Sequence, residues 1–117
     1  MDQNLEKKYV ERAVLVGLNA DCFTAEQTAN DETLRELEEL LQTAGGFCTG
    51  KVLQNRHTPD SHSFIGEGKA QEVRMLAEAT GATMIIFDNE LSPGNIRALE
   101  EITGMSQSSN LASAISP

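Results

Sequence analysis

The sequence of 117 residues lacks the segments that direct a chain into a membrane or out of the cell. No apolar run approaches the roughly 20 residues that a transmembrane helix needs, and no signal peptide opens the chain. Its two cysteines, Cys22 and Cys48, have neither the close spacing of a CxxC motif nor the density of a secreted disulfide scaffold. We therefore expect a single cytoplasmic domain with reduced thiols and a modest core.

Positive charge is also scarce. Nine Lys and Arg residues face 18 Asp and Glu residues, which gives a net charge of −9. This balance argues against a general nucleic-acid binder, because phosphate contacts dominate such affinity and require clustered cations. Only residues 51–74, which hold Lys51, Arg56, Lys69, Arg74 and both histidines, can present a locally positive surface. The acidic run from Glu26 to Glu39 is typical of a solvated helix face.

Apolar patterning predicts three buried strands that alternate with three amphipathic helices. The expected strands are residues 12–18, 47–54 and 83–87, and the expected helices are residues 31–44, 69–80 and 93–103. Residues 1–11 are polar and are expected to be frayed or to form a short leading helix. Gly50 weakens the second strand, which indicates a bulge or an edge position.

The order β-α-β-α-β-α predicts a three-layer α/β fold with a short parallel sheet, a Rossmann-like open sheet with the first strand near the middle. The predicted domain is residues 1–104, followed by a Ser-rich tail at residues 105–117. Ligands of such sheets bind beyond the carboxyl ends of the strands. That rim holds the connector 19–29, the loop 56–68 and the turn 88–92.

The loop between the second strand and the second helix is the candidate binding site. Its glycines, Gly66 and Gly68, allow close backbone approach, and Lys69 falls where a helix N-terminus already favours an anion. Arg56 adds a second cation, with His57 between them. This combination favours contact with a phosphate, either of a nucleotide or of an RNA backbone. The alternative is that the glycines only make the turn into the helix.

Known nucleotide motifs do not fit this loop. A Walker A ending fails because Ala70 replaces the magnesium-binding Ser or Thr, and a Rossmann fingerprint fails because Gln71 holds the last glycine position. At the rim, Asp88 and Glu90 either hold a magnesium ion or complement the dipole of the next helix. We predict no catalytic residue and no metal site, since the two histidines lack a third ligand.

Three stretches in order resemble the N-terminal domain of the HflX-type GTPases, over roughly residues 11–104. The first is residues 13–17, Ala-Val-Leu-Val-Gly. The second combines Val52-Leu53-Gln54, Arg56, Pro59-Asp60 and Phe64-Ile65-Gly66-x-Gly68-Lys69. The third is Ile85-Ile86-Phe87-Asp88-x-Glu90-Leu91-Ser92-Pro93, continued by Arg97-x-Leu99-Glu100.

The resemblance implies a cytoplasmic, ribosome-associated GTPase that acts on the large subunit and its rRNA, with a role in rescuing or splitting ribosomes under stress. GTP and Mg²⁺ would belong to a separate GTPase domain, so this part of the protein would need no cofactor and would not be an enzyme. The candidate loop would contact RNA or orient the GTPase domain. The alternatives are a small nucleotide-binding α/β module and a structural domain that packs on the GTPase domain.

Members of this family continue with a fourth strand, which residues 105–117 do not resemble. We therefore expect the third strand, with Met84-Ile85-Ile86 at its centre, to leave an open sheet edge. Exposed hydrophobic edges invite pairing with another chain, which predicts a tendency to form a homodimer.

Overall fold

The computed structural model describes residues 11–109 and has the predicted α/β architecture. Its elements are β1 (Arg12–Ala20), α2 (Asp31–Thr43), β2 (Phe47–Arg56), α3 (Glu67–Thr80), β3 (Met84–Phe87), α4 (Pro93–Thr103) and β4 (Ser106–Ser108). The four strands form one all-parallel sheet in the order β2-β1-β3-β4. The predicted fold class and the central position of the first strand are confirmed.

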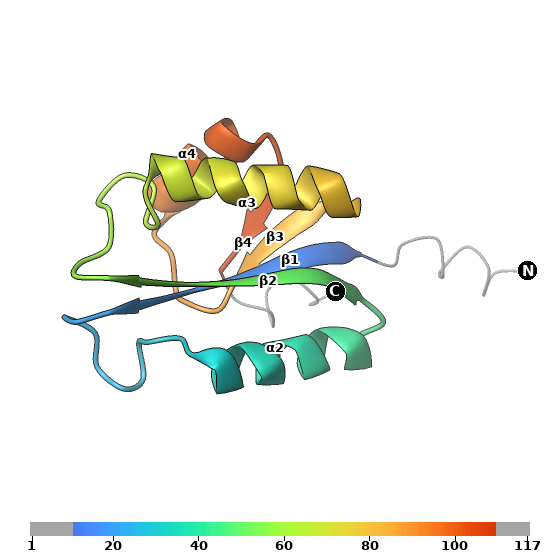
Figure 1. The fold of residues 1–117 in the computed structure, drawn as a ribbon, viewed down its shortest axis with the longest axis horizontal. Helices are drawn as coiled ribbons and strands as arrows, with labels where there is room; N and C mark the ends of the chain where they lie inside the picture. Colours follow the sequence, from blue (N-terminus) through green and yellow to red (C-terminus); the bar gives the residue numbers. More distant parts are fainter. Residues whose placement is uncertain (1–10, 110–117) are drawn as a thin grey trace, which may run out of the picture.

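The sheet lies between two helical layers, with α2 on one face and α3 and α4 on the other (Figure 1). Residues 13–18 of β1 are all buried, because alternate side chains point into opposite layers. Ala13 and Leu15 pack with Leu34 and Leu37 of α2. On the other face, Val14, Val16 and Leu18 pack with residues of α3 and α4, including Val73, Ala77 and Leu99. The continuous apolar run of β1 therefore serves two cores at once.

Glycine has the expected effect on β2. This strand lies at one edge of the sheet, and its register with β1 shifts where Ala13 pairs with Cys48 but Val14 pairs with Gly50. Thr49 is thus the extra residue of a bulge. A Cβ atom on Gly50 would lie 3.1 Å from Leu76 Cδ2, so the absence of a side chain also lets α3 pack closely on the strand.

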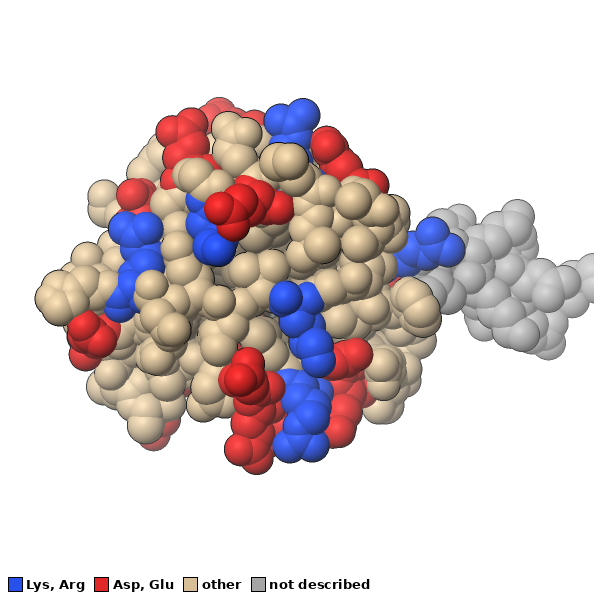
Figure 2. All heavy atoms as spheres, viewed as in Figure 1, with Lys and Arg blue, Asp and Glu red and all other residues tan. Residues whose placement is uncertain are grey.

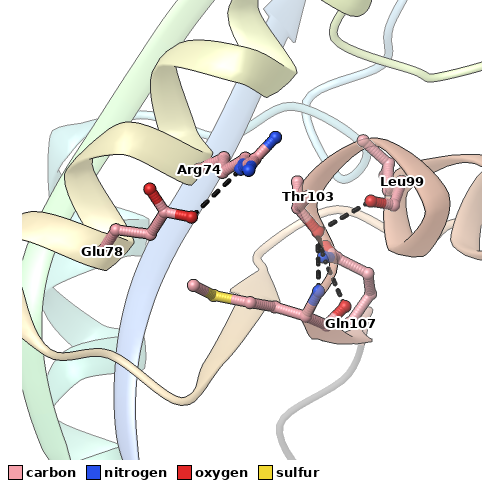
Figure 3. A network of polar contacts seen from close by, with 6 residues as sticks. Arg74, Glu78, Leu99, Thr103 and Gln107 are labelled. Atoms are coloured by element: carbon pink, nitrogen blue, oxygen red, sulfur yellow. Dashed lines mark hydrogen bonds and ion pairs between the residues drawn. The ribbon is translucent and has the colours of Figure 1, made fainter.

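The expectation that the fourth strand is missing is wrong. Ser106–Ser108 pairs in parallel with Met84–Ile86 and covers the edge of β3 that we expected to be open. The sequence Ser-Gln-Ser has no apolar residue, yet Gln107 is buried. Hydrogen bonds stabilise its side chain there, because Nε2 donates to Thr103 Oγ1 at 2.8 Å and to Met105 O at 3.1 Å. Figure 3 shows this network at the end of α4, where the Thr103 hydroxyl donates to Leu99 O.

The predicted homodimer consequently loses its proposed edge, and it stays a prediction that light scattering can test. The edges that remain are those of β2 and of the short β4. Residues 1–10 and 110–117, which include the expected leading segment and most of the Ser-rich tail, lie outside the described residues.

Helix boundaries follow local capping. Asn30 and Ser92 cap α2 and α4 through capping boxes, and Gly81 and Gly104 end α3 and α4 in the left-handed conformation. Helix α3 begins at Glu67, two residues before its expected start, so Gly68 and Lys69 lie in its first turn. Within residues 11–109, no helix is long and apolar enough to cross a membrane.

Candidate functional site at the strand-end rim

The loop between β2 and α3 is a compact, internally bonded turn. The Asp60 carboxylate accepts hydrogen bonds from the backbone N–H groups of His62 at 2.8 Å and Ser63 at 2.9 Å. The backbones of Asp60 and Phe64 also exchange two hydrogen bonds, which close the turn. The loop is therefore held in one shape by its own residues.

Arg56 braces this loop from inside. Its Nε donates to Thr58 O at 2.9 Å and its Nη1 donates to Ile65 O at 3.3 Å. The guanidinium lies over Gly66, where an added Cβ atom would be only 2.8 Å from Nη1. The structure thus brings Arg56 and Gly66 together. The contact is structural, because the guanidinium already donates hydrogen bonds to two backbone carbonyls.

Two side chains anchor the loop to the rest of the domain. Phe64 has a positive φ of 67° and is 7% exposed. Its ring stacks on Phe23 with centroids 6.3 Å apart and meets the edge of Phe87 at 6.0 Å. Asn95, in the first turn of α4, donates from Nδ2 to Ser61 O at 3.1 Å and to His62 O at 2.8 Å. The loop is fixed to both the core and a helix.

The other two basic side chains predicted for this site also contact acidic partners. His57, directly after the end of β2, has its Nδ1 2.6 Å from Oδ2 of Asp21, directly after the end of β1, and both side chains are exposed. Lys69 Nζ lies 3.0 Å from Glu72 Oε1 within α3. Gly68 faces open space, because a Cβ atom added to it would meet nothing within 4 Å. Arg56, His57 and Lys69 thus have separate partners, and their joint contact with a phosphate stays a prediction.

The lysines and arginines do not gather elsewhere on this side of the molecule. On the face in Figure 2 they are scattered, with acidic side chains beside most of them. Lys51 pairs with Glu38 and Arg74 with Glu78. This distribution agrees with the scarcity of positive charge in the sequence.

The rim also contains a groove, and Phe64 is one of the residues that line it. This groove of about 870 Å³ is lined mainly by the connector after β1, by α2 and by the β3–α4 turn. Its lining residues are Phe23, Glu26, Gln27, Leu37, Leu40, Phe64, Phe87, Asp88, Asn89, Glu90, Leu91, Ser92, Pro93 and Ser109. The predicted rim acids, Asp88 and Glu90, line this groove. Among the described residues, no group of three His, Cys, Asp or Glu side chains is placed to hold a metal ion.

Asn89 joins the walls of this groove, and sequence reasoning missed it. Its Oδ1 accepts from Leu18 N–H at 2.7 Å, and its Nδ2 donates to Leu18 O and Gln27 O at 2.9 Å each. The side chain is 4% exposed. It ties the end of β1, the following connector and the β3–α4 turn into one unit. Nothing in the sequence distinguishes it from its acidic neighbours.

The stability of the loop between β2 and α3 is expected to depend on pH through the carboxylate of Asp60. Hydrogen bonds from the backbone N–H groups of Ser63 and His62 hold the pKa of Asp60 below its ordinary value of 3.8. A carboxylate with a lowered pKa in the folded state stabilises the fold above its unfolded pKa, and this contribution is lost as pH falls through the folded value. We expect the protection of the His62 and Ser63 amides against hydrogen exchange, relative to their intrinsic exchange rates, to fall only below the ordinary aspartate pKa value of 3.8.

The matched variant for this experiment is Asp60→Asn, which keeps an acceptor oxygen but cannot titrate. Its loop amides are expected to stay protected without this pH dependence. Equal acid sensitivity in both proteins would assign the effect to other groups.

An open parallel α/β sheet with its loops and groove at the carboxyl ends of the strands defines a Rossmann-like domain. The chain belongs to the family described as GTP-binding GTPase N-terminal, which it matches over residues 31–108.

Curated relatives agree with this assignment. A protein named GTPase HflX from Escherichia coli is 38% identical over 92 residues, which is 79% of this chain and 20% of the relative. The GTPase HflX of Alkalihalophilus pseudofirmus is 32% identical over 103 residues, or 88% of this chain and 24% of the relative. That of Lacrimispora saccharolytica is 37% identical over 94 residues, or 80% and 21%. The chain thus spans between a fifth and a quarter of the length of these relatives.

Proposed function

We propose that this domain is the N-terminal ribosome- or partner-binding module of an HflX-like, ribosome-associated GTPase. The whole protein would couple GTP hydrolysis to binding of the large ribosomal subunit and to ribosome rescue or splitting under stress, in the cytoplasm. GTP and Mg²⁺ would be bound by its GTPase domain, and the module itself would not be an enzyme. The family membership and the shared names of the relatives support this proposal.

The observation that carries the proposal is the braced loop. Arg56, Asp60 and Phe64 hold it rigid from within, while His57, Ser61 and His62 stay exposed on its surface. A binding loop that is already ordered loses little conformational entropy when it meets a partner. Rigid loops displayed on a scaffold are the usual carriers of binding residues.

The nucleotide-binding alternative has weaker support. Lys69 is paired with Glu72, and the Arg56 guanidinium is directed at two backbone carbonyls. The groove at the rim contributes Glu26, Asp88 and Glu90, which repel a phosphate. Glu67 also occupies the first turn of α3, at the helix end where an anion would bind.

Sedimentation with purified large ribosomal subunits tests the proposal. We expect weak, salt-sensitive binding, because few cations are available and phosphate contacts release counterions. The double variant His57→Ala/Lys69→Ala is expected to lose it, whereas Arg12→Ala, which removes one cation at the amino end of β1, is expected to retain most of it. Absence of cosedimentation at low salt would contradict ribosome binding by this module.

Calorimetric titration with ATP and GTP, each with magnesium, tests the alternative that the domain is a nucleotide-binding module. We expect no saturable heat with either nucleotide. Binding that disappears in Lys69→Ala would replace our proposal with a nucleotide-binding module.

A further inference from the structure

The rim groove has an apolar floor whose exposed part comes from half-buried Phe23 and exposed Leu40. Leu37, Phe64 and Phe87 lie beneath it and are at most 7% exposed. Leu40, on the adjacent turn of α2, is 57% exposed and is one of three large apolar side chains with such exposure among the described residues. An exposed apolar surface with a concave shape is typical of a docking site for another polypeptide.

The charge around this floor is of one sign. Glu26, Asp88 and Glu90 line the groove, and no Lys or Arg is among its lining residues. None of these three carboxylates forms an ion pair or hydrogen bond with another residue in the 11–109 range. Unpaired carboxylates beside an apolar surface attract a cationic partner and repel a nucleic acid.

The walls of the groove are fixed before any partner arrives. Asn89 holds the β3–α4 turn to Leu18 and Gln27, and the Phe23–Phe64–Phe87 ring contacts join the connector to the core. Ser92 caps α4 at the end of the same turn. Such preorganisation lowers the entropic cost of binding.

We propose that this groove binds a basic amphipathic segment of a partner protein. Apolar side chains of the segment would lie on the floor beside Phe23 and Leu40, and its Lys or Arg side chains would pair with Glu26, Asp88 and Glu90. A volume of about 870 Å³ accommodates a few apolar anchors of a helix at i, i+3/i+4 and i+7 spacing. The inference goes beyond the proposed function, because it concerns a different surface and a ligand opposite in charge to RNA.

The probe is a fluorescent amphipathic peptide of Leu and Lys, about four helical turns long. Its controls are a sequence-scrambled peptide of the same composition and a Leu–Glu peptide of the same pattern. We expect saturable anisotropy with the Leu–Lys peptide and at least about tenfold weaker binding of both controls, since either change removes one half of the complementarity.

Variants that remove negative charges test whether the peptide binds in the groove. The triple variant Glu26→Gln/Asp88→Asn/Glu90→Gln is expected to weaken binding about tenfold or more. The matched control removes three exposed carboxylates outside the groove, in Glu39→Gln/Glu100→Gln/Glu101→Gln, and is expected to weaken binding less than about threefold through long-range attraction alone. Thermal unfolding establishes that both variants are folded.

Leu40→Asn tests the apolar contacts of the peptide and is expected to weaken its binding. The fold is expected to be unchanged, because the side chain of Leu40 is largely exposed. Equal weakening by the two triple variants, or no effect of Leu40→Asn, would overturn the inference in favour of general attraction to an acidic domain. Cosedimentation with ribosomal subunits does not use this probe, so failure here leaves the proposed function standing.

Discussion

Replacement of Gly66 by alanine is expected to lower the free energy of unfolding by about 2–3 kcal/mol. Gly66 has φ of 88° and ψ of 150°, a conformation that is essentially restricted to glycine. The new Cβ atom would also lie 2.8 Å from Arg56 Nη1 and would displace the guanidinium that braces the loop. Urea unfolding followed by circular dichroism measures the change.

Gly68→Ala is the matched control. This residue lies in the first turn of α3, and nothing lies within 4 Å of the position that its Cβ atom would take. Alanine favours the helix over glycine, so the variant is expected to be unchanged or more stable by up to about 1 kcal/mol. A similar loss of stability in both variants would show that the strained backbone and the Arg56 contact are not responsible.

Asn89→Leu is expected to lower the free energy of unfolding by about 3 kcal/mol, because buried polar groups lose their partners. The change leaves the N–H group of Leu18 and the C=O group of Gln27 without the amide that they contact, whereas the C=O group of Leu18 keeps its hydrogen bond from Ala29 N–H at 3.2 Å. Leucine has a similar volume, so the effect reports on hydrogen bonding more than on cavity formation. The β3–α4 turn is expected to show the largest increase in hydrogen exchange.

Asn55→Ala provides the comparison for Asn89. The Asn55 side chain accepts a hydrogen bond from Asn19 Nδ2 at 3.2 Å, but both residues are exposed, and water can replace the contact. The expected change is within about 0.5 kcal/mol. Comparable losses in the two asparagine variants would contradict the distinction between buried and exposed amides.

The sheet and helices could be predicted because apolar periodicity determines them. The run Ala13–Val16 indicated a doubly buried central strand, and the leucines of α2 indicated one packed face. Glycine and Ser-Pro signals gave the helix ends to within a few residues. These features depend on neighbours in sequence, which is the information that a single chain carries.

Features that do not follow from apolar periodicity could not be predicted. The β4 strand escaped prediction because Ser106–Ser108 has no apolar residue, and its place depends on pairing with Met84–Ile86, more than 20 residues earlier in the chain. The sequence also does not show that Arg56 donates to two backbone carbonyls of the loop that follows, and its contact with a phosphate stays a prediction. The groove combines residues of several separate segments, so the sequence indicated its acidic residues but not the apolar side chains that lie beside them.

The pairing of β1 has a consequence for synthesis of the protein. Ala13 pairs with Cys48 on one side and with Met84 on the other, so the central strand is complete only when most of the domain exists. Until then a nascent chain carries the apolar run of residues 13–18 with unpaired backbone groups. Long-range parallel pairing folds slowly and exposes such runs to aggregation. We expect chaperone binding to nascent chains that end before residue 84 and its release once β3 has emerged.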